Sequence, residues 1–274
     1  MGRRRVLVFT FPPTHPNCGL RAGERVRQDN RVTYAVDEVA PDVFFARGAD
    51  ANWVLLRDGR DVTLIDTGYP GYLADVLHSI RSIGSDPKYV AAVLITHAHV
   101  DHVGGANYFA ESFGTPVYTD ATEARHARRE FVEQATPWDI AKNLRPGMAP
   151  WLARVMRVGV LKKVAVSTAG AFPSGGELDV PGRPVPVPTH GHTSGHTAYH
   201  LPTVKAVATG DELVSGHALL RNAGPSLLPG FFSHGDVRES VGRLSGLNAE
   251  LILPGHGAPL RQPIALAVAD ALRR

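Results

Sequence analysis

The segment THAHVDHVGG, residues 96–105, follows directly on the apolar run VAAVLI at residues 90–95. A continuous apolar run of this length is typical of a strand that is buried on both faces of a sheet. Side chains two positions apart in extended backbone point the same way, so His97 and His99 can hold one cation. Asp101 and His102 follow where the chain turns into a predicted helix. They would face the same opening at the carboxyl end of the strand, where ligands collect, and would allow a second metal ion.

Three further segments carry ligands of the same kind. Asp211 follows the apolar run VAT, and His256 follows the apolar run LIL, each after a turn that contains Gly. A Gly-containing turn carries His190, His192 and His196. Imidazole nitrogens and carboxylate oxygens suit zinc, manganese or iron, whereas cuprous and iron–sulfur chemistry needs thiolates. The sequence therefore predicts a metal site with nitrogen and oxygen ligands.

Histidine and cysteine are used very unequally, with 13 His and one Cys among 274 residues. Seven of the histidines lie within residues 97–102 and 190–200. One Cys cannot form an internal disulfide, which favours a reducing compartment, and we expect a cytoplasmic protein. No apolar run approaches the roughly 18 residues of a membrane-spanning helix, so we expect no membrane span.

The charge of the chain is concentrated at one end. Residues 1–31 carry seven Arg against two acidic residues, while the remainder has a net charge of −2. Nucleic-acid binding needs a contiguous positive face, so a basic arm on a near-neutral body makes nucleic acid an unfavoured partner. We expect residues 1–31 to form a solvated arm or an edge strand. Residues 32–274 would then form a single domain.

Short apolar runs bounded by turn residues predict a layered α/β fold. The pair Asp58-Gly59 between two runs predicts a hairpin, and Gly84 is placed to end a helix over about 72–83. Residues 121–165 mix apolar residues with Arg and predict an insert of two or three helices. Strands then helices in two similar halves favour a sandwich over a doubly wound sheet. Further strands are expected near 43–46, 52–56, 62–65, 90–95, 117–119, 198–201, 206–209 and 251–253, and further helices over about 102–113 and 262–273.

Together these motifs resemble the metallo-β-lactamase superfamily over roughly residues 40–260. The His-x-His-x-Asp-His signature of that family stands here as HAHVDH at residues 97–102, and IDTG at residues 65–68 is also typical. The resemblance implies a four-layer αββα sandwich that carries the helical insert at 121–165. It implies one metal ion on His97, His99 and His192, a second on Asp101, His102 and His256, and Asp211 as the bridge between them.

The activity implied is that of a zinc-dependent hydrolase with a dinuclear site. Two divalent ions, most simply Zn²⁺ with Mn²⁺ or Fe as alternatives, would share a water whose pKa falls toward ~7. The resulting hydroxide would attack a carbonyl carbon, and Asp101 would both bind metal and orient the hydroxide. Asp66 is expected to fix a ligand rather than to bind metal, and His196 to brace the loop that carries His192.

The helical insert gives the best indication of the substrate. Trp138, Met148, Trp151 and Met156 could form an apolar lid, which favours an ester, lactone or thioester of a hydrophobic small molecule. The same side chains could instead bury themselves or form a homodimer face. His217 and His234 lie in loops after Asp211 that could overlook the metals, although an ordinary polar role is favoured for both.

Several other activities stay open. One is a metal-dependent phosphodiesterase or nuclease. Another is a mononuclear iron dioxygenase acting on a thiol or persulfide, which would leave Asp101 and His102 unligated. Oxygen reduction at a di-iron site is disfavoured because that branch has Glu where His99 stands. A β-lactamase is less favoured because the commonest zinc β-lactamases have Cys in place of Asp211, and a polyketide thioesterase or cyclase rests only on an Arg-rich composition.

Overall fold

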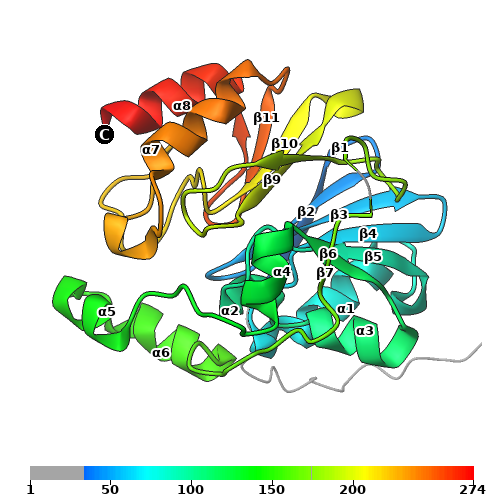
Figure 1. Ribbon diagram of the computed structural model, residues 1–274, viewed down its shortest axis with the longest axis horizontal. Coiled ribbons are helices and arrows are strands. Elements are labelled where there is room, and N and C mark those ends of the chain that lie inside the picture. The colour runs from blue at the N-terminus through cyan, green and yellow to red at the C-terminus, as the bar shows by residue number, and fades with distance from the viewer. Residues whose placement is uncertain (1–33, 174) are drawn as a thin grey trace, which may run out of the picture. The chain divides into compact units, whose positions relative to one another are not determined.

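The computed structural model describes residues 34–173 and 175–274 (Figure 1). The predicted basic arm or edge strand at 1–31 lies outside these residues. Strands β1 to β4 pair as an antiparallel meander, and β4 to β7 pair in parallel. Within the described residues this first sheet has seven strands in chain order: β1 Ala35–Ala40, β2 Val43–Arg47, β3 Asn52–Asp58, β4 Asp61–Ile65, β5 Val90–Leu94, β6 Val117–Thr119 and β7 Gly170–Ala171.

The predicted hairpin at Asp58-Gly59 is confirmed between β3 and β4. Asp58 pairs with Asp61 at the end of the ladder, and Gly59 has a φ of 60°. Gly reaches this left-handed conformation at no steric cost, which is why a Gly-containing pair fits a two-residue hairpin turn.

The second sheet is built from the later part of the chain. Its order is β12-β11-β10-β9-β8, in which only the β10–β11 pair is parallel. Because β10 and β11 are parallel neighbours, the turns after both strands lie at the same edge. The strands of this sheet in the described residues are β8 Val185–Pro188, β9 Thr197–Leu201, β10 Ala206–Gly210, β11 Leu251–Pro254 and β12 Leu260–Arg261.

Alternating side chains of β3 separate two layers of the core. Trp53 and Leu55 pack in one cluster with residues of α1 (Leu73–Ser82) and α3 (Ala106–Phe113). Val54 and Leu56 pack in another cluster with residues of β9, β10 and β11, so this cluster lies between the two sheets. Because side chains alternate with a period of two, both faces of β3 are buried, one against the helices and the other against the second sheet.

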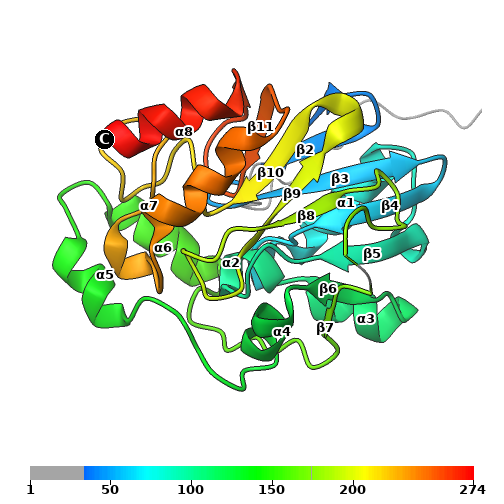
Figure 2. The same cartoon turned by 45° about the horizontal axis from the view of Figure 1, so that its top comes forward.

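A third cluster covers the outer face of the second sheet. Val207 and Ile252 pack against Ile264, Ala267 and Val268 of α8 (Ile264–Arg273). Helices therefore flank two stacked sheets, and the predicted four-layer αββα sandwich is confirmed (Figures 1 and 2).

The helix predicted over about 102–113 is wrong as a single element. The structure has a one-turn helix α2 (Val100–Val103), then α3 (Ala106–Phe113), with Gly104 and Gly105 between them. A Cβ at Gly104 would lie 2.2 Å from the backbone of Tyr69, and the Gly104 N–H donates to the Gly68 carbonyl at 2.8 Å. This close approach of two backbones requires Gly and breaks the helix, so that Asp101 and His102 sit on a separate turn.

The segment 121–165 forms three helices, in agreement with the predicted helical insert. They are α4 Ala121–Ala127, α5 Pro137–Asn143 and α6 Ala149–Val158, and a further short helix, α7 Val237–Ser240, lies in the second half (Figure 2). No helix in the described part of the chain is both long and apolar enough to cross a membrane.

Candidate metal centre

Seven side chains from five separate segments meet at one edge of the sandwich. His97 and His99 follow β5, Asp101 and His102 lie on α2, and His192 lies in the loop between β8 and β9. The other two follow the parallel strands β10 and β11. These two are Asp211 after β10 and His256 after β11. Six of the seven side chains are buried, and that of Asp101 is partly exposed.

The first group consists of three imidazoles whose nitrogens face one another. His99 Nδ1 lies 3.0 Å from His97 Nε2 and 3.1 Å from His192 Nε2. Asp211 Oδ2 lies 4.0 Å from His97 Nε2 and 3.7 Å from His192 Nε2. Burial lowers the pKa of His99 to about 4 and holds the pKa values of His97 and His192 well below their ordinary value. The rings are therefore neutral, which is the form that binds a metal ion.

The second group consists of two imidazoles and two carboxylates. His256 Nε2 lies 3.4 Å from Asp101 Oδ2 and 3.2 Å from Asp211 Oδ2, and His102 Nε2 lies 3.3 Å from Asp211 Oδ1. Burial acts to lower the pKa of His256, but the carboxylates of Asp211 and Asp101 outweigh it and raise the pKa to about 10. Burial acts to raise the pKa of Asp211, but His256 and His102 hold it well below its usual range. A cation entering this group must displace protons from the imidazoles.

Several polar atoms at the centre have no hydrogen-bond partner. Among the described residues these atoms are His102 Nε2 and Asp211 Oδ1, which lie 3.3 Å apart without forming a hydrogen bond. His192 Nδ1 also makes no hydrogen bond, but it is the other nitrogen of a ring whose Nε2 faces the cluster. Leaving a buried polar atom unpaired costs ~1–3 kcal/mol, so each such atom calls for an explanation. Cations in the two groups would supply partners for His102 Nε2 and Asp211 Oδ1, and the donor set of nitrogen and oxygen atoms fits a divalent metal ion such as zinc. The residues present therefore fit the metal ions that the sequence predicts.

The outward nitrogens of three imidazoles are held by neighbouring groups. His99 Nε2 donates to the backbone carbonyl of Glu133 at 2.8 Å, and His256 Nδ1 donates to the backbone carbonyl of Asp50 at 2.6 Å. His97 Nδ1 lies 3.0 Å from the hydroxyl of Thr96. These contacts fix the ring orientation and place a proton on the outward nitrogen, so that the inward nitrogen is the one that can bind a metal ion.

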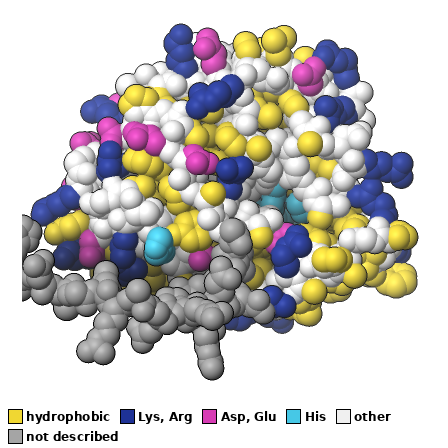
Figure 3. All heavy atoms as spheres, turned by 180° about the vertical axis from the view of Figure 1, so that it is seen from behind, with side chains coloured by type: hydrophobic (Ala, Val, Ile, Leu, Met, Phe, Trp, Pro, Cys, Tyr) yellow, Lys and Arg dark blue, Asp and Glu magenta, His cyan; other side chains and the backbone are white. Residues whose placement is uncertain are grey.

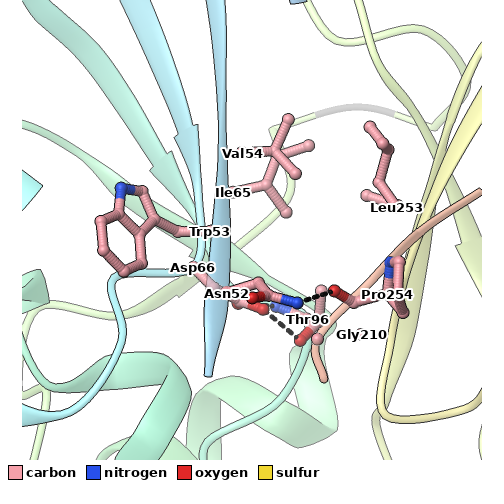
Figure 4. A pocket seen from close by; sticks show the side chains of 11 residues that line it. Asn52, Trp53, Val54, Ile65, Asp66, Thr96, Gly210, Leu253 and Pro254 are labelled. Carbon is pink, nitrogen blue, oxygen red and sulfur yellow. Dashed lines mark hydrogen bonds between the residues drawn. The ribbon is translucent and has the colours of Figure 1, made fainter. Parts of the chain in front are cut away.

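Asp66 lies behind the ligands rather than among them. His102 Nδ1 donates to its carboxylate at 2.8 Å, and the backbone N–H and the hydroxyl of Thr96 donate to it at 2.8 Å each. Asp66 itself adopts a φ of 62°, in the left-handed region. Figure 4 shows Asp66 next to Thr96, with Asn52 donating to the Pro254 carbonyl nearby. The geometry is that of a carboxylate that positions His102.

His196 occupies a similar position beneath the first group. The backbone N–H of Asp211 donates to its Nε2 at 3.2 Å, so its Nδ1 donates to the Thr189 hydroxyl at 2.8 Å. Its ring lies 5.1 Å from that of His97, between centroids. His196 thus links two ligand-bearing loops while pointing no nitrogen into the cluster.

Glu123 is a supporting residue that the sequence did not indicate. Its buried carboxylate accepts from the backbone N–H of Ala98 at 2.7 Å, the hydroxyl of Thr193 at 2.7 Å and the backbone N–H of Gly195 at 3.1 Å. His126 donates to the same carboxylate at 2.7 Å. Glu123 therefore joins the loop of His97 and His99 to the loop of His192.

We expect Glu123→Ala to lower the free energy of unfolding by ~3–5 kcal/mol, because it leaves several buried donors and a buried imidazole unpaired. Urea unfolding followed by circular dichroism measures the change. Glu111→Ala, which removes an exposed carboxylate of α3, is the matched control and should cost little. A loss below 1 kcal/mol for Glu123→Ala would show that the bridge between the loops is not needed.

The four predicted lid residues lie in different environments. The Trp151 ring lies 5.8 Å from that of His217, which in turn lies 4.9 Å from the ring of His256. Met148 is buried. Trp138 is 66% exposed, with the Lys142 ammonium 5.1 Å from its ring, and Met156 is 48% exposed. The structure thus links Trp151 to the metal cluster through the ring of His217 and leaves Trp138 and Met156 exposed.

His217 is nearer the cluster than the sequence indicated. It lies in the loop after β10, and the backbone N–H of Leu219 donates to its Nδ1 at 3.2 Å. Arg145, between α5 and α6, donates to the carbonyls of Leu219 at 2.7 Å and Ala218 at 3.3 Å. Through Arg145, the insert therefore holds the loop of His217 in a position where the His217 ring lies beside that of His256.

Comparison with known proteins agrees with this site. Residues 46–256 match the family model of the metallo-beta-lactamase superfamily, which is most of the chain. The chain belongs to that superfamily.

Among its relatives, the probable metallo-hydrolase YflN of Bacillus subtilis is 24% identical over 216 residues, which is 75% of this chain and 79% of the relative. Metallo-beta-lactamase domain-containing protein 1 of Xenopus laevis is 29% identical over 226 residues, which is 82% of this chain and 76% of the relative.

Solved structures share the fold at low identity. The subclass B3 metallo-beta-lactamase BJP-1 of Bradyrhizobium japonicum aligns with a TM-score of 0.62 at 15% identity, covering 87% of this chain and 90% of that one. The Rm3 metallo-beta-lactamase aligns with a TM-score of 0.64 at 17% identity, covering 88% and 91%. At these identities the likeness bears on the fold alone.

Proposed function

We propose that this protein is a metal-dependent hydrolase with two divalent ions at one site. The observation that carries the proposal is the pair of facing donor groups that share Asp211, with buried nitrogen and oxygen atoms left unpartnered. His97, His99 and His192 would hold one ion. Asp101, His102 and His256 would hold the other, with the Asp211 carboxylate between the two groups.

Bound divalent ions would acidify a water enough to make it a nucleophile near neutral pH and would polarise the carbonyl oxygen of the substrate. The protein's own part is to hold the ligands and to orient the water. Asp101 is the one ligand that is partly exposed, so its carboxylate can accept a hydrogen bond from the attacking water. Asp66 and His196 keep His102 and the Asp211 turn in place. Zinc is the metal that best fits this donor set, with manganese or iron as alternatives.

The walls beside the cluster support a hydrophobic small molecule as the substrate. Aromatic rings surround His217: between ring centroids, His217 lies 5.8 Å from Trp151, 6.0 Å from Phe232 and 4.9 Å from the proposed ligand His256. On the face in Figure 3, His side chains reach the surface among hydrophobic side chains. An ester, lactone or thioester with an apolar acyl group would match both the aromatic rings around His217 and the chemistry of the ions.

We expect Trp151→Ala to raise KM for a hydrophobic aryl ester about tenfold while kcat stays within about threefold, because the ring would bind the apolar part of the substrate rather than the reacting carbonyl. Steady-state kinetics with the metal-loaded protein measures both constants. Trp138→Ala, which removes the outward-facing Trp of the same insert, is the matched control. A fall in kcat with unchanged KM would contradict a role for Trp151 in substrate binding.

The proposed function is tested with a panel of substrates offered to the metal-loaded protein. The panel contains p-nitrophenyl esters of increasing acyl length, lactones, thioesters, β-lactams and phosphodiesters. Hydrolysis of the carbonyl substrates that improves with acyl length is the expected result. Turnover of phosphodiesters alone, or oxygen uptake with a thiol at a single iron, would overturn it.

A further inference from the structure

A pocket separate from the metal centre lies between the segment 220–230 and the helices α7 and α8. Its volume is about 570 Å³, and it shares no lining residue with the metal cluster. This volume is in the range of pockets that enclose small molecules. The apolar side chains of its lining are those of Leu220, Leu227, Leu228, Val237 and Ala271, of which Leu228 and Ala271 are buried.

Three guanidinium groups from separate segments line the same pocket. Arg221 comes from the loop, Arg238 from α7 and Arg274 from just after α8, and no Asp or Glu is among the described residues that line the pocket. The charged residues that line the pocket are thus all cationic, which favours an anionic ligand over a cationic one.

The guanidinium groups keep most of their donors available. Arg238 donates to the carbonyl of Leu272, and Arg274 donates to the carbonyl of Ala223 at 3.0 Å. Each guanidinium has five N–H donors, so these bonds orient the side chains and leave further donors for a ligand. Arg221 is exposed and has no hydrogen-bond or ion-pair partner among the described residues. Planar forks of this kind match the oxygens of a carboxylate or phosphate.

We propose that this pocket binds a small amphiphilic anion, with its carboxylate or phosphate head on the arginines and an alkyl or aryl body on the leucines. The Asn222 amide, which also lines the pocket, can donate a hydrogen bond to the head. The site does not depend on the hydrolytic reaction. The segment Val214-Ser215 nevertheless contacts both sites. Val214 pairs with Ser226 of the pocket, and the Ser215 N–H donates to the backbone carbonyl of the proposed ligand His256 at 3.0 Å.

Isothermal titration calorimetry on the full-length, metal-loaded protein tests the proposal. The ligands are octyl phosphate and octanoate below their micelle concentrations, with inorganic phosphate and octyltrimethylammonium for comparison. We expect one octyl anion per chain, at least about tenfold tighter than inorganic phosphate or the cation, since burial of the octyl chain and the ionic contacts add. Whichever of the two octyl anions binds more tightly identifies the preferred head.

Variants separate this site from the metal centre. Arg221→Gln together with Arg274→Gln should weaken binding about tenfold or more, whereas Arg81→Gln, an exposed arginine on α1, should not. Asp211→Asn should bind the octyl anion as the unmodified chain does, even if hydrolytic activity is lost. If the double variant does not fold, Arg221→Gln alone serves, because this side chain has no partner to lose.

The proposal is wrong if the double variant binds as the unmodified chain does, or if Asp211→Asn abolishes binding. The second result would place the anion on the metal ions. Equal affinity for inorganic phosphate or for octyltrimethylammonium would equally remove the amphiphilic anion as the ligand.

Discussion

Replacing Asp211 with Asn is expected to lower kcat/KM for a carbonyl substrate by about 10³-fold or more, which corresponds to ~4 kcal/mol of lost transition-state stabilisation. The carboxylate lies 3.2 Å from His256 Nε2, 3.3 Å from His102 Nε2 and 3.7 Å from His192 Nε2, so it faces both donor groups. Asn has nearly the same shape but carries no charge and offers an N–H donor where an acceptor is needed. We therefore expect the second ion to be lost along with the activity.

Steady-state kinetics and elemental analysis of the same preparation measure the two effects of Asp211→Asn. Asp61→Asn, which changes an exposed carboxylate of β4, is the matched control and should keep both activity and metal. If Asp211→Asn kept two ions per chain and more than a tenth of the activity, the carboxylate would not be the bridge between the groups.

Removing the metal should also destabilise the fold, by about 10 °C in Tm. Metal present at 1,000 times its Kd stabilises a protein by ~4 kcal/mol, and 1 kcal/mol moves Tm by ~2–4 °C in a chain of this size. The physical reason is that the buried imidazoles and carboxylates of the cluster lose the cations that pair them. Differential scanning calorimetry after dialysis against dipicolinate measures the shift, and adding Zn²⁺ or Mn²⁺ should restore both Tm and activity.

His192→Ala provides the comparison for metal removal. Because this variant lacks a ligand of the first group, the chelator should lower its Tm by less than it lowers the Tm of the unmodified chain. Equal shifts in the two proteins would mean that the stabilising metal lies elsewhere, and no shift in either would mean that the cluster is stable without metal.

The parts of the site that could be predicted from the sequence are those carried by local pattern. The buried run 90–95 and the spacing of His97 and His99 determine a strand end with two imidazoles on one side. The turns before Asp211 and His256 follow apolar runs in the same way, and the parallel pairing of β10 and β11 places them at one edge. Local sequence pattern, together with the resemblance to the metallo-β-lactamase superfamily, was sufficient to predict the fold and to propose the set of ligands.

The supporting contacts could not be predicted because they join distant segments. Glu123 is 70 residues from Thr193, and no local pattern distinguishes it from an ordinary acidic residue in the first turn of a helix. His99 and His256 are oriented by backbone carbonyls of Glu133 and Asp50, which carry no sequence signal at all.

The orientation of the helices in the insert at 121–165 could not be predicted either. Its apolar residues predict helices, but a helical pattern does not say which face meets the metal centre. Arg145 and Trp151 turn toward the loop of His217, whereas Trp138 lies outside. The break in the predicted helix at Gly104 has a similar origin, since it depends on the approach of the backbone at Tyr69.

Anomalous X-ray diffraction at the zinc edge, on crystals of the zinc-loaded protein, shows directly whether the site holds two ions. We expect two anomalous peaks per chain, one among His97, His99 and His192 and the other among Asp101, His102 and His256, with the Asp211 carboxylate between them. A single peak, or peaks outside these two groups, would contradict the dinuclear site.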